Sequence, residues 1–499
     1  MANVRAINAL LARHAGVWRV RGAKSVSLSG RRWFSVTCPD HPPASPPPLP
    51  LSHTMRASIA LAEQRQRPVR GPYADRLEVE RAVDSVENGG PTRAMRLLGA
   101  YCHYTERGAQ PGEPRPDPLM GEFGRAFTDH MLECAFRQGE WQAPRIVPRH
   151  ALALDPGASS LQYGLQIFEG MKVYRPKRPH WNAPTPDVVR LFRPLENMRR
   201  LYRSAARLAL PLFDAHAMLQ LLEEYVRVES AWVPQCDADE EGLTPALYLR
   251  PTLISTDARL GVRRPSEALF YVIASPALGS YYSSSNNTAA AGVTLFATDA
   301  FARAWPGGVG DAKCGGNYAL GLVAQELAIT EGCQQVLWLD AQQRVTEAGV
   351  MNFFVVFDDG AVCTPPVDTG MILPGVMRDS VLQLIRSGTV GAAPGGRAWR
   401  VHERALPIDE LTRGIVSGRV VEAFGTGTAA TISPVAGIRY REREYRFEAR
   451  ARPLSTALKR ALDHICYGDE SALEAHPWLH PVYGSGRPAA ASASHTQFG

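Results

Sequence analysis

The sequence predicts a mixed α/β fold built from two domains. From about Pro118 onward, short runs typical of strands alternate with amphipathic stretches typical of helices. Residues 284–292 are small or polar, so this segment reads as a joint that divides this part of the chain. A chain of 499 residues has room for two or three domains. We therefore expect a smaller α/β domain at 116–283, a linker at 284–292, a larger domain at 293–484 and a flexible tail at 485–499.

The smaller domain is expected to contain strands and one long helix. Its strand-like runs span Val188 to Phe192, Ala246 to Leu253 and Ala268 to Ala274. Residues Leu195 to Leu210 are expected to be helical because their apolar side chains recur on one face. That buried stripe comprises Met198, Leu201, Tyr202, Ala205 and Leu208.

The larger domain repeats this mixture. Asp358-Asp359-Gly360 has the composition of a hairpin turn. A helix is expected to start after Pro374-Gly375 and to run through Leu384. The other predicted elements are strands at Leu295 to Ala297, Val336 to Asp340 and Met351 to Phe357, and a helix from Tyr318 to Thr330.

The first 34 residues have the composition of a mitochondrial presequence. They include seven Lys and Arg residues, no Asp or Glu, and several serines. Apolar and basic residues would fall on opposite faces of a helix. We expect a disordered presequence at 1–34 that directs the protein to the mitochondrial matrix and is removed near Arg32-Trp33-Phe34-Ser35. A basic tail without a targeting role is the alternative.

Residues 35–115 are predicted to be a proline-rich linker followed by an extension without an assigned role. Six of the nine residues from 42 to 50 are proline, which prevents helix and sheet. Within the extension, Asp75 to Glu87 is expected to form a helix capped by Asp75.

Charge and cysteine content exclude several classes of function. The net charge of +6 becomes about −1 when the seven N-terminal cations are subtracted (6 − 7), so no basic surface for nucleic acid is expected. The eight cysteines include no Cys-x-x-Cys pair, which argues against a metal site and a disulfide framework. No apolar run is long enough to span a bilayer, so no membrane partner is expected.

Lys313 is the first candidate for catalysis. It lies between the pairs Gly307-Gly308 and Gly315-Gly316, and Tyr318 follows five residues later. Glycine lets a large group approach the amine, and a lysine amine can condense with a carbonyl. A nucleotide-binding P-loop is excluded because Ala312 precedes the lysine and Cys314 follows it. A solvated surface lysine is the structural alternative.

Four further segments could bind an anion or a cofactor. Gly375 opens a predicted helix, whose first-turn amides suit a phosphate. The turn Gly425 to Ala430 offers hydroxyls and amides. Glu347 precedes an apolar strand, and Arg250 lies within one. Each has a plain structural alternative: a helix start, a hairpin turn, a solvated strand end or a paired surface arginine.

Together these segments resemble the branched-chain amino-acid aminotransferases, which are fold-type IV enzymes that use pyridoxal 5'-phosphate. The similarity runs from about Phe123 to Tyr440 and more weakly to Val482. The segments that carry it are Phe127-Thr128-Asp129-His130-Met131, Tyr163-Gly164-Leu165-Gln166-Ile167-Phe168-Glu169-Gly170-Met171-Lys172, Phe192-Arg193-Pro194, Arg250-Pro251-Thr252-Leu253-Ile254, Arg303-Ala304-Trp305-Pro306-Gly307-Gly308 and Ile372-Leu373-Pro374-Gly375-Val376.

The resemblance implies a role for each candidate at the cofactor. Lys313 would hold the cofactor aldehyde covalently and later move a proton. Tyr318 would bind the ring oxygen, and Glu347 would face the pyridine nitrogen, keeping the ring an electron acceptor. The residues implied for the phosphate are Arg200, the amides of Val376 and Met377, and Thr428.

The resemblance also implies a substrate pocket and a homodimer. Its apolar walls would be Tyr163, Phe168, Tyr248 and Tyr281, with Tyr163 reaching across the dimer interface. The amide of Ala429 and the side chain of Arg250 would meet substrate carboxylates. The implied reaction moves an amino group between leucine, isoleucine or valine and 2-oxoglutarate, which gives glutamate.

The sequence departs from the family at two places. Val350 stands where many relatives carry Thr or Ser, which removes a hydroxyl beside the cofactor. Ala430 and Ser433 stand where mammalian members carry a thiol pair, so that redox switch cannot be transferred. The remaining alternatives are a D-amino acid aminotransferase or lyase of the same fold, and a non-catalytic homologue that acts as an interaction protein.

Overall fold

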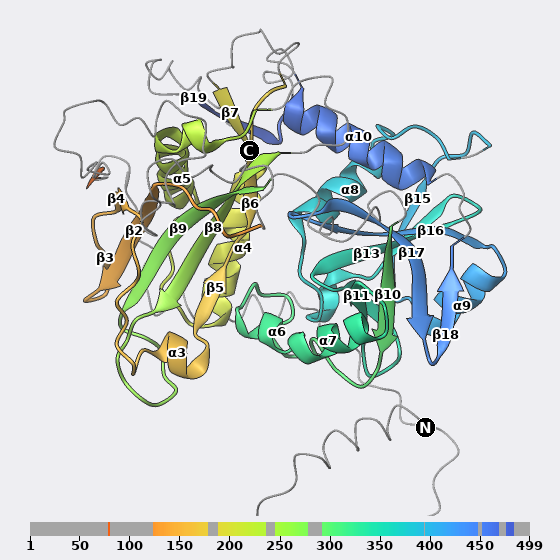
Figure 1. Cartoon of the computed structure of the whole chain (residues 1–499), viewed down its shortest axis with the longest axis horizontal. Coiled ribbons are helices and arrows are strands. Elements are labelled where there is room, and N and C mark those ends of the chain that lie inside the picture. Colours follow the sequence, from red (N-terminus) through yellow and green to blue (C-terminus); the bar gives the residue numbers. More distant parts are fainter. Residues whose placement is uncertain are drawn as a thin grey trace, which may run out of the picture. The chain divides into compact units, whose positions relative to one another are not determined.

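The computed structural model describes residues 78–79, 123–177, 188–235, 245–277, 292–393, 395–447, 452–468 and 476–483. All of them belong to one compact unit, Pro48–Gly499, in which the described strands form two sheets (Figure 1). The predicted presequence, the tail at 485–499 and Tyr281 lie outside the described residues. So do residues 35–115 apart from 78–79, and the linker at 284–292 apart from its last residue.

The first sheet has ten strands in the order β1-β4-β2-β9-β8-β6-β7-β19, with β3 paired to β2 and β5 paired to β8. Every pairing in it is antiparallel except that of β1 with β4. Its strands are β1 (Glu78–Val79), β2 (His130–Arg137), β3 (Glu140–Trp141), β4 (Arg145–Pro148), β5 (Gln166–Phe168), β6 (Met171–Tyr174), β7 (Val188–Phe192), β8 (Ala246–Ser255), β9 (Ala268–Ala277) and β19 (Leu479–Tyr483). The short helix α3 (Ser159–Tyr163) precedes β5.

Two amphipathic helices, α4 (Pro194–Arg207) and α5 (Ala215–Val228), pack into the core of the first sheet. Helix α4 begins with Pro194 in its first turn, where a missing N–H costs no hydrogen bond. Helix α5 is capped by Asp214, whose carboxylate accepts the N–H groups of His216 and Ala217. A 3₁₀ turn (Ser230–Trp232) follows α5. Arg200 lies on α4, so the packing of α4 against the first sheet determines where Arg200 lies.

The second sheet has nine strands in the order β12-β11-β10-β17-β16-β13-β14-β15, with β18 paired to β17. Strand β12 also pairs with β13, so β12, β11, β10, β17, β16 and β13 form a closed ring. The strands are β10 (Val293–Thr298), β11 (Gln335–Leu339), β12 (Val345–Ala348), β13 (Met351–Phe357), β14 (Ala361–Thr364), β15 (Arg400–Glu403), β16 (Val420–Gly427), β17 (Thr431–Tyr440) and β18 (Arg443–Arg446). The helices in this part are α6 (Gly316–Ala319), α7 (Leu322–Thr330), a 3₁₀ turn (Val367–Thr369), α8 (Val376–Arg386), α9 (Ile408–Val416) and α10 (Pro453–Tyr467).

The segment around Lys313 joins the two sheets. Ala312 and Cys314 are buried in the core of the first sheet, although the next elements belong to the second. Cys314 also forms an isolated bridge with Ile167 of β5. The N–H of Phe168 donates to the carbonyl of Lys313 at 3.1 Å. Main-chain hydrogen bonds therefore hold the lysine segment against β5 of the first sheet.

Most predicted elements are found, and two are corrected. The strand at Val188–Phe192 has the predicted bounds, and the predicted helix from Leu195 is α4. The helix predicted for Tyr318 to Thr330 is wrong as one element, because the chain turns at Gly321 and forms α6 and α7. An added Cβ at Gly321 would lie 3.3 Å from the Trp338 ring, so this glycine packs tightly on β11.

The helix predicted for Asp75 to Glu87 is wrong at Glu78–Val79, which form strand β1. Both residues pair in parallel with Arg145 and Ile146 of β4. Strand β4 would otherwise leave a row of unpaired backbone groups at that edge, and pairing there overrides the local preference for helix.

The division of residues 116–283 and 293–484 into two domains stays a prediction. Strand β19 comes from the second range, yet it extends the first sheet by pairing with β7. Among the described residues, no helix combines the length and apolarity needed to cross a membrane. The same residues contain no cluster of three or more His, Cys, Asp or Glu side chains placed for a metal ion.

Candidate active site

Lys313 points its amine at a tyrosine hydroxyl. Its Nζ donates to the Oη of Tyr318, at the start of α6, over 2.8 Å. The amine also lies 4.8 Å from the centre of the Phe168 ring. The main-chain N–H of Lys313 donates to the Ser204 hydroxyl of α4 at 2.9 Å. The lysine is thus fixed at its backbone and at its amine.

The glycines around Lys313 serve close packing of the chain. An added Cβ at Gly315 would lie 2.4 Å from the Gln166 side chain of β5. An added Cβ at Gly310 would lie 2.8 Å from the carbonyl oxygens of Gly370 and Met371. These glycines therefore allow the lysine segment to approach both β5 and the loop before α8.

A buried carboxylate, Glu347 of β12, is clamped by three donors. Its Oε2 lies 2.8 Å from Nε of Arg303, and its Oε1 accepts the N–H of Leu373 at 2.8 Å. Asn352 of β13 donates to Oε1 at 3.4 Å. Burial raises the pKa of Glu347, while Arg303, the Leu373 amide and Lys313 act in the opposite direction. The arrangement holds one carboxylate at a fixed place in a dry site.

A second buried ion pair joins Arg200 of α4 to Glu169, the residue after β5. Arg200 donates from Nε and Nη2 to the two carboxylate oxygens at 2.7 and 2.8 Å. Asn197 donates to the same carboxylate at 2.9 Å. Burial disfavours the charged carboxylate, but the charge and hydrogen bonds of Arg200 outweigh it and lower the pKa of Glu169. Arg200 also donates to the carbonyl of Pro374 at 3.1 Å, which places it beside the start of α8.

The first turn of α8 offers free amides. Its cap residue, Gly375, has no side chain to bond them, and the first hydrogen bond of the helix runs from Asp379 back to Gly375. The N–H groups of Val376 and Met377 therefore have no partner within the helix. An added Cβ at Gly375 would lie 2.1 Å from Oδ1 of Asn352, so only glycine fits there.

The turn between β16 and β17 offers a second set of free amides. Among the described residues, no acceptor is hydrogen-bonded to the N–H of Thr428, Ala429 or Ala430. The hydroxyl of Thr428 donates to the carbonyl of Gly170 at 3.3 Å, which ties the turn to the end of β5. Consecutive free amides in a turn bind anions.

One wall of the site combines aromatic rings with an arginine. The guanidinium of Arg250 lies 4.7 Å from the centre of the Phe168 ring and 5.3 Å from that of Tyr248. Its Nη2 donates to the Tyr248 hydroxyl at 3.3 Å, while its buried Nε has no hydrogen-bond partner among the described residues. An added Cβ at Gly170 would lie 1.9 Å from that hydroxyl, so Tyr248 packs directly on the backbone. This cation is shielded by rings and keeps an unused donor.

Tyr163 is a partly exposed aromatic residue. It lies at the end of α3, its side chain is 39% exposed, and its hydroxyl accepts the N–H of Gly261 at 2.6 Å. Within the described part of the chain, nothing joins Tyr163 to Lys313.

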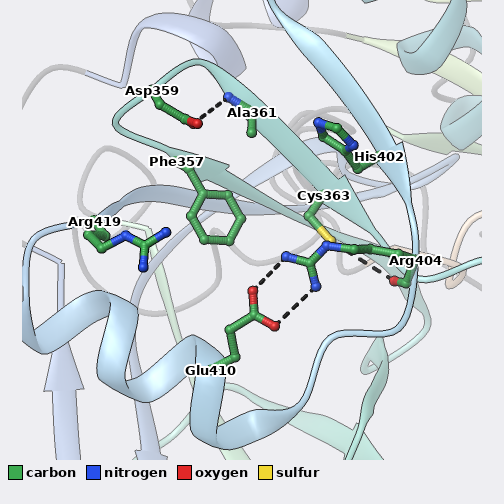
Figure 2. A pocket seen from close by; sticks show the side chains of 8 residues that line it. All are labelled: Phe357, Asp359, Ala361, Cys363, His402, Arg404, Glu410 and Arg419. Carbon is green, nitrogen blue, oxygen red and sulfur yellow. Dashed lines mark hydrogen bonds and ion pairs between the residues drawn. The ribbon is translucent and has the colours of Figure 1, made fainter.

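A separate cavity of about 190 Å³ lies beside Phe357, the last residue of β13 (Figure 2). Two of the charged residues that line it neutralise each other, because Arg404 donates to both carboxylate oxygens of Glu410. Ligand pockets are usually larger than this, about 300 Å³ or more. The cavity shares no residue with the Lys313 site; it is lined by Phe357, Asp359, Ala361, Cys363, His402, Arg404, Glu410 and Arg419.

Comparison with known proteins defines first the class and then the family. The model of the class IV amino-transferases matches residues 166–438. The cytosolic branched-chain-amino-acid aminotransferase of Ovis aries is 40% identical over 367 residues, which are 72% of this chain and 88% of that protein. The mitochondrial enzyme of Schizosaccharomyces pombe is 38% identical over 380 residues, 74% of this chain and 82% of its own. The chain belongs to the branched-chain-amino-acid aminotransferase family.

A solved structure shows the same fold. The branched-chain aminotransferase of the thermophilic archaeon Thermoproteus uzoniensis superimposes with a TM-score of 0.53 at 25% identity, covering 71% of this chain and all of that one. The predicted fold class is confirmed. Relatives of similar identity include both cytosolic and mitochondrial enzymes, so family membership does not select a compartment.

Pyridoxal phosphate is the cofactor of this class, and the residues present fit it. The free amides of the first turn of α8, the amide of Thr428 and the remaining N–H groups of Arg200 offer donors for a phosphate, while the amide of Ala429 stays available for a substrate carboxylate. Lys313 supplies the amine for the aldehyde, and Glu347 supplies a buried carboxylate for the ring nitrogen. The role of each residue stays a prediction, but the structure gathers a donor set of the required chemistry.

Sequence reasoning missed the residues that orient these groups. Glu169 and Arg303 occur in segments that resemble the family, yet nothing in the sequence pairs them with Arg200 and Glu347. Asn352 follows Met351 in a strand and reads as an ordinary polar residue. Their partners lie 31, 44 and 5 positions away along the chain, respectively. Only folding shows that two buried ion pairs flank the lysine.

Proposed function

We propose that the protein transfers the amino group of leucine, isoleucine or valine to 2-oxoglutarate, with pyridoxal phosphate held at Lys313. One observation carries the proposal: the Lys313 amine lies 2.8 Å from the Tyr318 hydroxyl, at the junction where free amides and a buried carboxylate converge. The names of the most similar relatives supply the substrate class.

The chain's own residues divide the work. Bound pyridoxal phosphate supplies an aldehyde and an electron-withdrawing ring that stabilises negative charge on the substrate α-carbon. When a substrate amino group has taken its place at the aldehyde, the freed Lys313 amine would accept the α-proton at Nζ and could give it back. The Tyr318 hydroxyl orients that amine. Glu347, fixed by Arg303, keeps a negative charge where the ring nitrogen binds. Because Arg303 and the Leu373 amide bind both carboxylate oxygens, the Glu347 side chain is held in one orientation.

One pocket has to accept both apolar and acidic side chains. Phe168 and Tyr248 offer an apolar surface for a branched side chain. Arg250 lies behind these rings with an unused Nε–H, so a glutamate carboxylate can find a cation without an open charged surface. This arrangement supports a double-substrate pocket.

We also propose that the enzyme works as a homodimer. The α6–α7 region exposes large apolar side chains at Leu320, Leu322 and Val323, whose exposed fractions are 51%, 64% and 62%. Tyr163 is exposed and apart from the Lys313 site. A second copy that covers such surfaces would supply its Tyr163 to this pocket. Size-exclusion chromatography with light scattering tests this; a monomer with full activity would contradict it.

The mitochondrial matrix is the compartment that we propose. The seven cations and the absence of acids in residues 1–34 support it, and mitochondrial relatives such as the bovine enzyme are 40% identical. A fusion of residues 1–40 to a fluorescent reporter should enter mitochondria. A diffuse cytosolic signal would refute this assignment.

The reaction is tested with the purified protein and 2-oxoglutarate. Leucine, isoleucine and valine should each give glutamate, D-alanine should not, and Lys313→Ala should lose both the activity and the visible absorption of the bound cofactor. Activity on D-alanine alone would identify a D-amino acid aminotransferase. A colourless wild-type protein that does not bind added pyridoxal phosphate would indicate a non-catalytic homologue.

A further inference from the structure

Lys172 is a buried lysine for which the proposed reaction has no role so far. It lies in β6 opposite Tyr248 of β8, and only 4% of it is exposed. A buried ammonium is costly unless it is hydrogen-bonded. Within the described part of the chain, its single hydrogen bond runs to the carbonyl of Ala429 at 2.9 Å.

That carbonyl belongs to the turn with the free amides. The Ala429 carbonyl shares its peptide group with the N–H of Ala430, and this N–H has no partner among the described residues. A cation on the carbonyl polarises the peptide group and makes the N–H a stronger donor. The ammonium therefore acts on this N–H through the carbonyl of the same peptide group.

The turn is held at two points by one short stretch of chain. Thr428 donates its hydroxyl to Gly170, and Lys172 donates to Ala429 two residues further along. Both contacts link β6 and the residue before it to a turn more than 250 positions away in sequence. Removing the lysine would leave the Thr428 hydroxyl as the remaining bond between this stretch and the turn, so the amides between β16 and β17 would be held less firmly.

We propose that Lys172 is a positioning residue for substrate: its ammonium fixes and polarises the 428–430 turn so that the turn's amides bind the substrate α-carboxylate. The inference rests on the proposed function and on the expectation, implied by the family resemblance, that an amide of this turn meets the substrate carboxylate. Since leucine, glutamate and both oxo acids carry the same carboxylate beside the reacting carbon, Lys172 should affect all of them alike.

The charge state of Lys172 agrees with this role. Burial lowers the pKa of Lys172 to about 8, although Cys466 and Asp463 of α10 raise it and Lys459 lowers it further. At pH 7 the side chain is therefore still a cation. Methionine has a similar length and no charge, so Lys172→Met removes the donor without leaving a large cavity.

The experiment compares Lys172→Met with Lys459→Met, which removes a half-buried lysine of α10 that pairs with Asp463. In the cofactor-loaded enzyme, Lys172→Met should raise KM about 10-fold for leucine and for 2-oxoglutarate, which corresponds to about 1.4 kcal/mol, while kcat and cofactor affinity stay within about threefold. Lys459→Met should leave KM unchanged. A purely structural lysine would instead change the unfolding midpoint and leave both KM values at wild-type level.

A pair of inhibitors tests whether the carboxylate is the group that senses Lys172. The inhibition constant of 4-methylpentanoate should rise about 10-fold in Lys172→Met, whereas that of its neutral amide should change less than twofold. An equal change for both would overturn the inference. The proposed function fails separately: it is refuted if the wild type does not transaminate leucine, whereas this inference is refuted if the wild type does so and Lys172→Met behaves identically.

Discussion

Replacing Arg303 by methionine tests whether the buried clamp on Glu347 is energetically important. The arginine is 10% exposed and the glutamate 3%, with 2.8 Å between Nε and Oε2. Breaking a buried ion pair by removing one partner costs about 3–5 kcal/mol, because the remaining charge stays in a dry site. Arg303 also donates to the Met371 carbonyl at 2.7 Å, and losing that bond adds to the cost. We expect the cofactor-free Arg303→Met protein to lose about 4 kcal/mol of unfolding free energy at pH 8.

The pH dependence identifies the cause of that loss. Burial raises the pKa of Glu347 in the folded protein, and removing Arg303 should raise it further. At a pH between the unfolded and folded pKa values of Glu347, the folded state binds a proton that the unfolded state does not. The free-energy cost of burying the unpaired carboxylate is therefore largest at high pH and decreases as the pH falls toward 4.5. The difference between wild type and Arg303→Met should therefore shrink on acidification.

Urea unfolding followed by circular dichroism measures these differences. The double variant Arg303→Met/Glu347→Gln should recover most of the loss at pH 8, because no unpaired charge remains. Arg400→Met, which breaks the exposed pair with Asp359, is the matched control and should cost under about 1 kcal/mol. A loss in Arg303→Met that is equally small, or that does not change with pH, would refute the reasoning.

Three further substitutions separate the other groups of the site. Glu169→Gln should weaken cofactor binding about 10- to 100-fold, as measured by equilibrium dialysis of the cofactor. The reason is that Arg200 loses the carboxylate that binds it at two points and orients its remaining N–H groups. Lys172→Met should change the pH dependence of stability: in the wild type the unfolded chain binds more protons between pH 8 and 10.5, so the wild type gains about 3 kcal/mol relative to the variant across that window. Gly170→Ala should lower stability by about 1–3 kcal/mol and impair leucine binding, because the new methyl group collides with the Tyr248 hydroxyl.

Matched controls exist for each of these changes. Glu196→Gln breaks an exposed pair with Arg199 on α4 and should leave cofactor affinity unchanged. Gly316→Ala has open space for its methyl group and should be tolerated. Wild-type cofactor affinity in Glu169→Gln, a flat difference for Lys172→Met between pH 8 and 10.5, or full stability of Gly170→Ala would each contradict the contact that it tests.

The order of strands and helices was largely predictable because it follows from local patterns. The strand-like run Val188–Phe192 and the apolar stripe of α4 are intrinsic to their segments. Strand β1 was not predictable, because Glu78–Val79 are strand only through pairing with β4. The break between α6 and α7 likewise depends on how closely Gly321 packs on Trp338, a contact between distant residues.

The sequence predicted the residues whose side-chain type alone suggests a function, but not the residues that hold them in place. Lys313 was identified from its flanking glycines and Tyr318, and the structure brings that tyrosine to its amine. The partners that orient the site were not predictable: Glu169 for Arg200, Arg303 for Glu347 and Lys172 for the 428–430 turn. Each pairing depends on tertiary contacts that no spacing in the sequence encodes. The flanking glycines also proved to serve chain packing as well as access.

Reduction of the cofactor-loaded protein with tritiated borohydride, followed by peptide mapping, tests the central claim most directly. Borohydride makes the bond between cofactor and amine permanent, so the labelled residue identifies the attachment site. The account predicts one label per chain, on the peptide that contains Lys313, and none in Lys313→Ala. A label on any other lysine, including Lys172, or no label at all would contradict it.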